Sequence, residues 1–201
     1  LDEKGEKISK SKGNGITIEE WLKYASPESL SLYMYQNPKR AKKLYSDVVP
    51  KAVDEYLTCI DKFSEQDIQH KLLNPVWHIH NGNPPKFDSE INFNSLMNLV
   101  SICNSTDKNV IWSFVNEYDS SLNAKDYPVF DKLIQFAINY YIDFVIPNKK
   151  YVVIDEKNRL VFEDILSLLK TVDITSTSEE IQTQIYEIGK NHNFANLRNY
   201  F

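Results

Sequence analysis

The chain has 201 residues, of which 42% are hydrophobic and 25% charged, and its formal net charge is −5. This composition is typical of a soluble globular protein with one ordinary domain or two small ones. No apolar run approaches the roughly 20 residues that a helix needs to cross a bilayer, so we expect no membrane span. Residues 1–51 carry ten basic and seven acidic side chains, and the remainder carries thirteen and twenty-one. A basic amino-terminal segment followed by an acidic remainder favours a local anion-binding site over a protein that binds nucleic acid with its whole surface.

The cysteines and the two ends of the sequence bear on location and completeness. Cys59 and Cys103 are too far apart for a metal knuckle and lie in apolar helical patterns. We expect buried thiols in a reducing compartment, which favours the cytoplasm. The sequence has no initiator methionine and no basic-then-apolar leader, and it stops on Phe201 without a capping or breaking residue. We therefore expect a piece of a longer protein, cut at both ends.

The first 35 residues begin with a loop and continue with two helix signals. Residues 1–15 are polar and punctuated by glycine, which predicts a loop, entered from a short strand or a turn at residues 2–5. Thr17 and Glu20 form a capping box, which predicts a short helix ending near residue 25. Ser26 followed by Pro27 is a second start signal, and it predicts a further helix through residues 30–35.

After residue 44, apolar residues recur mostly at steps of three and four, which is the spacing of the apolar face of an amphipathic helix. This spacing predicts helices over residues 45–63, 92–103, 107–118, 128–146 and 178–192. The stretch 151–170 is ambiguous, because residues 151–154 would suit a strand, but its spacing favours mostly helix. Residues 73–88 hold three prolines and a glycine and predict a loop. Without any strand-helix-strand alternation, we predict an all-α protein, with a small leading segment before a helical bundle or cage.

The opening loop has the chemistry of a phosphate clamp. Lysine ammonium groups supply mobile positive charge, serine hydroxyls donate hydrogen bonds, and glycines let the backbone turn tightly around an anion. The loop is not a P-loop, because the spacing G-x-x-x-x-G-K is absent. The candidate residues are Lys7, Ser9, Lys10, Ser11, Lys12, Gly13 and Gly15.

The order of residues 7–11, KISKS, resembles the K-M-S-K-S signature of class I aminoacyl-tRNA synthetases, with Ile8 in place of methionine. The resemblance implies a loop that closes over ATP, with Mg²⁺ expected alongside it. It implies that Lys7 and Lys10 are catalytic, and that Lys7, Ser9, Lys10, Ser11 and Gly13 contact the ATP phosphates. The second lysine, Lys10, would stabilise the charge that builds on pyrophosphate. Removing one such preorganised donor typically costs about 3 to 4 kcal/mol of transition-state stabilisation.

Residues 13–57 resemble the corresponding region of class I lysyl-tRNA synthetase, and residues 74–80, NPVWHIH, add to the resemblance. It implies an ATP-dependent ligase that activates lysine to lysyl-adenylate and transfers it to tRNA-Lys. It divides the chain into a signature loop over 1–15, a connecting segment that contacts the tRNA stem over 16–60, and a helical anticodon-binding domain over 61–201. The Rossmann core, its H-I-G-H motif and the lysine pocket would lie outside this chain. The piece alone is therefore expected to be inactive.

Three further groups of side chains invite a function. Lys39, Arg40, Lys42 and Lys43 form a basic run that suits a solvated helix face and, given the resemblance, contacts to tRNA phosphates. His78 and His80 lack a cysteine or carboxylate partner at metal-binding spacing, so we predict no metal site. The aromatics Trp112, Phe114, Tyr140 and Tyr141 have core spacing, although an exposed one among them could stack on an anticodon base.

Two other interpretations stay open at this point. Another class I synthetase, of a glutamyl-like kind with a helical anticodon domain, would carry the same signature loop. A non-enzymatic helical RNA-binding module that happens to carry a lysine-rich loop would show no dependence on ATP or pyrophosphate. The sequence leaves the oligomeric state and the residues that recognise the anticodon undefined.

Overall fold

The computed structural model of the chain describes residues 1–9, 11–87, 89–150, 154–173 and 175–192. Within these ranges the regular elements are helical and no β-strand occurs, which confirms the predicted all-α class. None of the described helices is long and apolar enough to cross a bilayer. The chain divides into two compact units, Leu1–Lys149 and Lys150–Phe201.

The first two helices start as their local signals predict. Helix α1, Ile18–Tyr24, begins at a complete capping box, in which Thr17 Oγ1 accepts from Glu20 N and the Glu20 carboxylate accepts from Thr17 N. Helix α2, Pro27–Tyr35, has its proline at the first position, and Ser26 Oγ accepts from Ser29 N at 3.2 Å. Both starts are fixed locally, because each cap satisfies a backbone amide that has no partner within the helix.

Helices α3, Val48–Glu65, and α6, Phe93–Cys103, pack against each other in the first unit. Pro50 is the third residue of α3, so its missing amide falls in the first turn, where helix amides have no intrahelical partner. The Asp54 carboxylate of α3 accepts from the backbone amide of Phe93, at 2.7 Å, and thereby ties the start of α6 to α3.

The predicted loop over residues 73–88 is wrong at its beginning. Helix α4, Ile68–Leu73, is followed directly by helix α5, Pro75–Ile79. Pro75 starts α5 instead of breaking a helix, because a proline at the first position gives up no hydrogen bond. Asn74 caps α5 by accepting from Val76 N, and its amide nitrogen donates to the carbonyl of Cys59 in α3. This tertiary anchor has no local sequence signal.

Helix α7, Lys108–Tyr118, and helix α8, Pro128–Tyr140, follow the prediction in their starts. The expected helix over 128–146 changes its winding after residue 140, to a π-helical turn, η1, at Tyr141–Val145 and a 3₁₀ turn, η2, at Ile146–Asn148. This change accompanies burial of Tyr141, whose hydroxyl donates to Asn104 Oδ1 at 2.6 Å at the end of α6.

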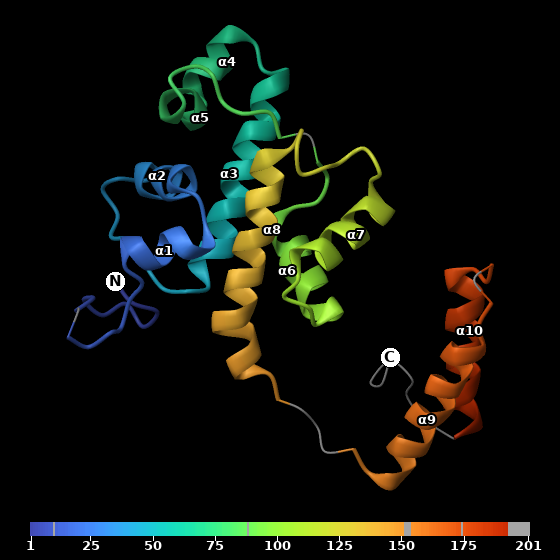
Figure 1. The fold of residues 1–201 in the computed structure, drawn as a ribbon. Coiled ribbons are helices and arrows are strands. Elements are labelled where there is room, and N and C mark those ends of the chain that lie inside the picture. Colours follow the sequence, from blue (N-terminus) through green and yellow to red (C-terminus); the bar gives the residue numbers. More distant parts are fainter. Residues whose placement is uncertain (10, 88, 151–153, 174, 193–201) are drawn as a thin grey trace. The chain divides into compact units, whose positions relative to one another are not determined.

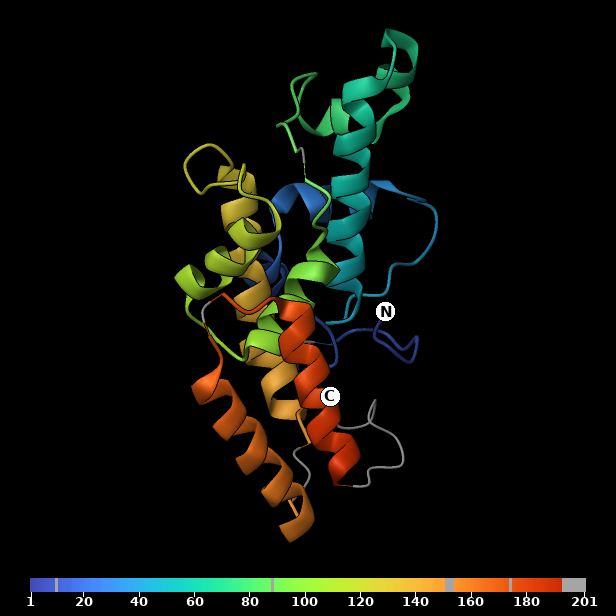
Figure 2. The same ribbon diagram turned by 90° about the vertical axis from the view of Figure 1, so that its right-hand side faces the viewer.

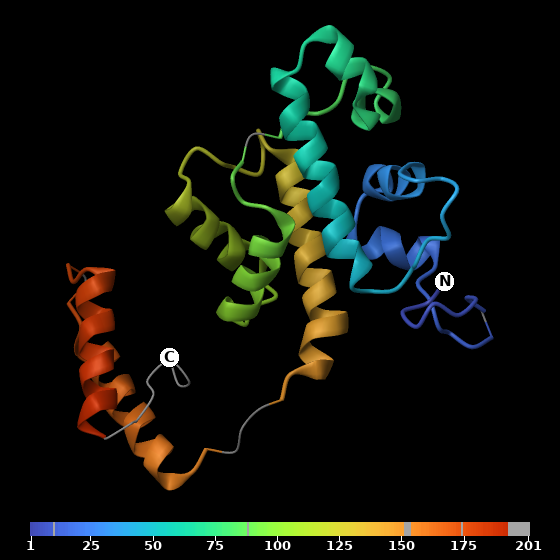
Figure 3. The same cartoon turned by 180° about the vertical axis from the view of Figure 1, so that it is seen from behind.

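The core of the first unit lies where these helices meet. Helix α8 packs against α1, α6 and α7, and α3 packs against α2, α5 and α6 (Figure 1). Seen from behind, α1 lies between the opening loop and α2 (Figure 3). The largest fully buried side chains are Trp21, Tyr141, Phe93, Phe130, Leu32, Leu96 and Ile111. Cys59 and Cys103 are half-buried rather than fully buried as expected, and burial raises the pKa of both thiols.

The second unit holds helix α9, Glu156–Thr171, and helix α10, Ser178–Asn191, which pack against each other (Figure 2). Thr177 and Glu180 form a capping box at the start of α10. His192 Nε2 lies 2.7 Å from Asp164 Oδ2 and links the end of α10 to α9. Both helices were predicted, and residues 151–153 of the strand alternative lie outside the described residues.

Candidate functional site

The opening loop leaves the helical body and returns to it at one place. The backbone amide of Leu44 donates to the carbonyl of Leu1 at 2.8 Å, and the amide of Ile16 donates to the carbonyl of Leu44 at 3.0 Å. Residues 2–15 therefore form a closed excursion whose two ends meet on a single residue of the segment between α2 and α3. A loop closed in this way keeps its base in place while its tip is free to meet a ligand.

The tip of the loop is a single tight turn. The amides of Lys12 and Gly13 both lie 3.1 Å from the carbonyl of Ser9, and Gly13 has a φ of 58°, in the left-handed region. Glycine adopts that conformation without the penalty that a side chain would add. The hydroxyls of Ser9 and Ser11 lie 2.9 Å apart, on the same side of the turn. The turn thus brings together the hydroxyl groups that the sequence assigned to a phosphate site.

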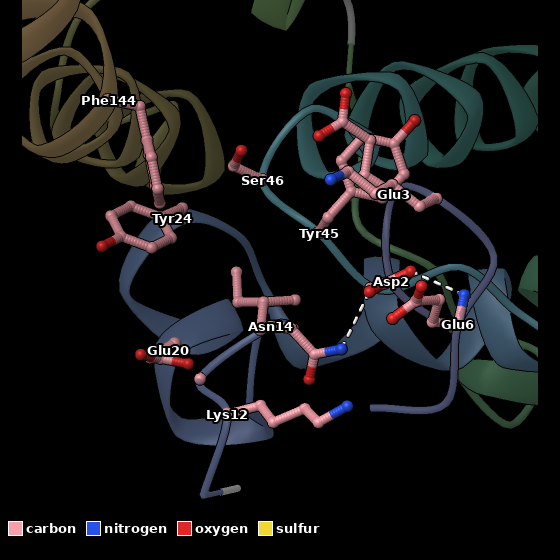
Figure 4. A pocket seen from close by; sticks show the side chains of 14 residues that line it. Asp2, Glu3, Glu6, Lys12, Asn14, Glu20, Tyr24, Tyr45, Ser46 and Phe144 are labelled. Carbon is pink, nitrogen blue, oxygen red and sulfur yellow. Dashed lines mark hydrogen bonds between the residues drawn. The ribbon is translucent and has the colours of Figure 1, made fainter. Parts of the chain in front are cut away.

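The base of the loop is held by side chains to which the sequence assigned no role in binding. Asn14 Nδ2 donates to Asp2 Oδ2 at 2.8 Å, and Asn14 Oδ1 accepts from Ser9 N at 2.9 Å. Asp2 Oδ1 accepts from Glu6 N at 2.7 Å (Figure 4). The bond from Glu6 N and the bond from Asn14 outweigh burial and lower the pKa of Asp2. No local pattern marks this pair beyond the usual preference of asparagine for turns.

A cavity of about 630 Å³ lies between the loop base, the start of α1 and residues 45–46. Its rim is predominantly acidic, because Asp2, Glu3, Glu6 and Glu20 outnumber Lys4 and Lys12 (Figure 4). Tyr24 and Phe144 supply apolar walls. The acidic rim does not suit a free polyphosphate. Lys12 and Gly13, from the tip of the loop, also line this cavity.

The residues predicted to contact ATP divide between the described and the undescribed parts of the loop. Lys10 lies outside the described residues, so its position is undefined. Lys7, Ser11 and Gly13 are exposed, and Ser9 is half-buried. Ile8, which stands where the signature has methionine, packs against Gly15, since a Cβ built on Gly15 would lie 2.7 Å from Ile8 Cδ1. The apolar position of the signature therefore helps to fold the loop.

The basic run does not act as a single patch. The Lys43 ammonium donates to the carbonyl of Glu3 at 2.8 Å, and the Lys42 ammonium donates to the carbonyl of Gln36 and lies 4.9 Å from the centroid of the Tyr33 ring. Lys39 and Arg40 are exposed, and their side chains make no hydrogen bond with any residue in the described ranges. The Lys43 ammonium thus stabilises the base of the loop, and the Lys42 ammonium holds the segment after α2 against the end of that helix. Lys39 and Arg40 remain available for an outside anion.

The histidines of residues 70–80 have partners within the fold. His80 Nε2 lies 2.8 Å from Tyr56 Oη, and burial lowers the pKa of His80. His78 Nε2 lies 2.9 Å from the carbonyl of Leu72. In the part of the chain that the structure describes, no three His, Cys, Asp or Glu side chains gather around a point that could hold a metal ion.

The aromatic residues on α7 and α8 separate into core and surface. Trp112, Tyr140 and Tyr141 are buried, and Trp112 Nε1 donates to Asp131 Oδ1 at 3.0 Å. Phe114 is 49% exposed, which makes it the exception that spacing could not identify. Tyr118, one turn further along α7, is 69% exposed, so the two rings share one face of the helix.

A match to a protein family model indicates the class of protein that the first part of the chain resembles. Residues 1–83, which contain the opening loop, α1 to α5 and their connections, match the family model described as tRNA synthetases class I (K). The match supports class I character for the loop and the segment that holds it.

The relatives that the chain resembles are all named for the same amino acid, lysine. The whole chain is 48% identical to part of the lysine–tRNA ligase of Rickettsia rickettsii (strain Sheila Smith), over 203 aligned residues. The lysine–tRNA ligases of Rickettsia felis and Rickettsia bellii are similar to the same extent, 48% in each case. The chain spans 39% of the length of each of these relatives. No solved structure matches the chain.

Proposed function

We propose that this chain is the carboxy-terminal part of a class I lysine–tRNA ligase, which activates lysine with ATP and transfers it to tRNA-Lys. The observation that carries the proposal is the 48% identity to lysine–tRNA ligases along the whole chain. The signature order in the opening loop and the family match over residues 1–83 support it. We place the activity in the cytoplasm. We expect the chain alone to be inactive, because it spans only 39% of the length of those relatives.

The tip of the opening loop is the proposed ATP contact. Lys7 supplies positive charge, the hydroxyls of Ser9 and Ser11 donate to phosphate oxygens, and the turn at Gly13 presents them together. Lys10 stabilises the pyrophosphate that leaves as the lysine carboxylate attacks the α-phosphorus. The loop gives electrostatic stabilisation that strengthens as negative charge moves onto the leaving group. Mg²⁺ accompanies the ATP as its counterion and is not assigned to any residue of this chain.

The basic segment is the proposed contact to tRNA backbone. Lys39 and Arg40 are the exposed members of the run, and they position the nucleic acid through its phosphates without selecting a sequence. Lys42 and Lys43 contribute indirectly, since their ammonium groups hold the loop base and the segment that carries Lys39 and Arg40. In this proposal residues 1–15 serve ATP, residues 16–60 connect to the tRNA stem, and residues 61–201 bind the anticodon arm.

The exposed ring of Phe114 on α7 is the proposed stacking surface for an anticodon base. A base stacked on an exposed aromatic side chain typically contributes about 1 to 3 kcal/mol to binding. Tyr118 extends the same face and offers a second ring.

Lysine-dependent exchange of pyrophosphate into ATP tests the proposal in the natural protein that contains this chain. The expected result is exchange with lysine and with no other amino acid, and a loss of about a hundredfold or more in the Lys10→Ala variant. Exchange that depends on glutamate would instead identify a glutamyl-like synthetase. Absence of exchange with every amino acid, with and without tRNA, would contradict the proposal and favour an RNA-binding module.

A further inference from the structure

The opening loop contains a hydrogen-bonded pair, buried Asp2 and half-buried Asn14, that the proposed chemistry does not use. Asp2 is 7% exposed and is one of few buried polar residues in the described part of the chain. Its carboxylate accepts a hydrogen bond from the side-chain amide of Asn14 at 2.8 Å. The two residues lie 12 positions apart and span almost the whole loop. Their bond therefore closes the loop from within, just inside the backbone closure on Leu44.

Asn14 links this closure to the two residues that carry the signature. Its Oδ1 accepts from the backbone amide of Ser9 at 2.9 Å, and its Nδ2 also lies 3.3 Å from the carbonyl of Lys7. One amide group thus fixes the backbone on both sides of Ile8. The directions in which the side chains of Lys7 and Ser9 project from the loop depend on the conformation of that backbone.

Asp2 in turn fixes Asn14. Its second carboxylate oxygen accepts from Glu6 N at 2.7 Å, and its backbone amide donates to the Glu6 carbonyl at 2.9 Å, so Asp2 is tied to Glu6 by both its side chain and its backbone. A charged acceptor makes a stronger hydrogen bond than a neutral one and is costly to leave without a partner when buried. The hydrogen bond from Asn14 to Asp2 therefore restricts the movement of the Asn14 side chain.

We infer that Asp2 and Asn14 are positioning residues of the signature loop, and that their bond sets where Lys7 and Ser9 meet the ATP phosphates. This inference rests on the proposed function for the identity of the ligand. In this inference neither side chain contacts ATP, and both act through the backbone of residues 7–9. The inference assigns a role in catalysis to two residues outside the K-M-S-K-S match.

The pair can be tested by swapping the two residue types between positions 2 and 14. In Asn14→Asp, two carboxylates face each other, and in Asp2→Asn, one amide donor faces another whichever way the new side chain turns. In the double variant Asp2→Asn/Asn14→Asp, the residue at position 2 accepts from Glu6 N and donates to position 14, which still accepts from Ser9 N. The double variant keeps every bond of the pair except the long one to the Lys7 carbonyl.

The kinetic experiment measures lysine-dependent pyrophosphate exchange in the natural protein and these variants. We expect kcat/KM for ATP to fall about a hundredfold in Asn14→Asp and about tenfold in Asp2→Asn, with the KM for lysine unchanged. The double variant is expected to recover to within about fivefold of the natural protein. Independent, additive losses in the double variant would overturn the inference, because they would show that the two side chains are not coupled.

A second measurement keeps the inference testable even if the proposed function fails. Hydrogen exchange of the Ser9 amide reports its bond to Asn14 without any substrate, and we expect it to quicken about tenfold or more in each single variant and to slow again in the double variant. Natural protein without lysine-dependent exchange would overturn the proposed function alone. A Ser9 amide that exchanges equally in all four proteins would overturn the positioning role.

A matched control comes from a second asparagine–aspartate pair, between α7 and α8. Asn123 Nδ2 donates to Asp126 Oδ2 at 2.9 Å on the surface, away from the loop. Asp126→Asn is expected to change neither the kinetics nor the Ser9 amide exchange. If Asp126→Asn lowers kcat/KM as much as Asp2→Asn does, the effect is general and the specific role of Asp2 is contradicted.

Discussion

The hydroxyl of Tyr24 donates to the carboxylate of Asp143 at 2.7 Å, across 119 residues of sequence. Tyr24 ends α1, the helix that directly follows the opening loop, and Asp143 lies in the π-helical turn η1 after α8. The rings of Tyr140 and Phe144 pack around Tyr24 with centroids 6.0 and 4.9 Å away. The segment behind the loop is therefore fastened to the helical body at one aromatic site.

Replacing Tyr24 with Phe tests this fastening. The variant removes the hydroxyl and keeps the buried ring, so we expect a loss of about 1 kcal/mol in the free energy of unfolding. Chemical denaturation followed by circular dichroism measures it. Asp143→Asn keeps an acceptor for the tyrosine and is expected to cost less, and an equal or larger cost would contradict the assignment of the bond.

The contact between Ile8 and Gly15 predicts the effect of a single added methyl group. Gly15→Ala places a Cβ within 2.8 Å of three side-chain atoms of Ile8, so the loop must shift to make room. Such overpacking typically costs about 1 to 3 kcal/mol. We expect slower pyrophosphate exchange and faster hydrogen exchange of the Ser9 amide.

A compensating change isolates that cause. Ile8→Ala in the Gly15→Ala background removes the crowded atoms, and we expect it to restore part of the lost loop order. If Gly15→Ala alone behaves as the natural protein does, Ile8 does not pack on Gly15 in solution.

The division of the basic run predicts two kinds of behaviour on substitution. The double variant Lys39→Ala/Arg40→Ala should weaken tRNA binding and flatten the slope of log K against log salt by about 1.5, without loss of stability. Filter binding over a range of KCl concentrations measures the slope. Lys43→Ala should instead loosen the loop, because its ammonium bonds the Glu3 carbonyl. Equal salt slopes for Lys39→Ala/Arg40→Ala and the natural protein would refute the phosphate contact.

Phe114 predicts a loss of tRNA affinity without a loss of fold. Phe114→Ala is expected to weaken tRNA-Lys binding by about 1 to 3 kcal/mol, and Phe114→Tyr to retain most of it. Val115, the next residue, is fully buried, so Val115→Ala serves as a stability control that acts by a cavity. Unchanged affinity in Phe114→Ala would remove this ring from the proposed anticodon contact.

His80 predicts a dependence of stability on pH. Burial lowers the pKa of His80 below its ordinary value of 6.5, and the charge of Glu28 partly opposes the shift. The unfolded chain then binds more protons than the folded one, so the free energy of unfolding decreases as pH falls below 6.5 towards the folded pKa.

The comparison protein for this prediction is His80→Gln, which keeps an acceptor for the Tyr56 hydroxyl and cannot titrate. Denaturation between pH 7.5 and pH 5 should show a smaller loss of stability in His80→Gln than in the natural protein. A steeper loss in His80→Gln would mean that the pKa of His80 is raised in the fold.

The parts of the fold that the sequence predicts are those with local causes. The starts of α1, α2 and α10 depend on caps within four residues, and the apolar stripes of α3, α6 and α7 depend on spacing along one helix. Helix α5 was missed because Pro75 was counted as a breaker, although Asn74 in front of it is a cap. A proline opens or interrupts a helix according to its neighbours.

The parts of the site that the sequence does not predict join residues far apart in the chain. The bond between Asp2 and Asn14 spans 12 residues, and the bond from Lys43 to Glu3 spans 40. Composition identified the lysines as cations, but it cannot tell whether an ammonium group binds a backbone carbonyl or an outside phosphate. The signature residues were found by their order, and the groups that hold them were found only in three dimensions.

Charging of unfractionated tRNA by the natural protein that contains this chain tests the proposed lysine–tRNA ligase activity in one assay. Each of the twenty amino acids is supplied in turn with ATP, and the aminoacyl-tRNA formed is identified. We expect charging with lysine alone, on tRNA-Lys, and loss of this charging in the Lys10→Ala variant. Charging with glutamate or another amino acid, or equal charging by Lys10→Ala, would contradict this expectation.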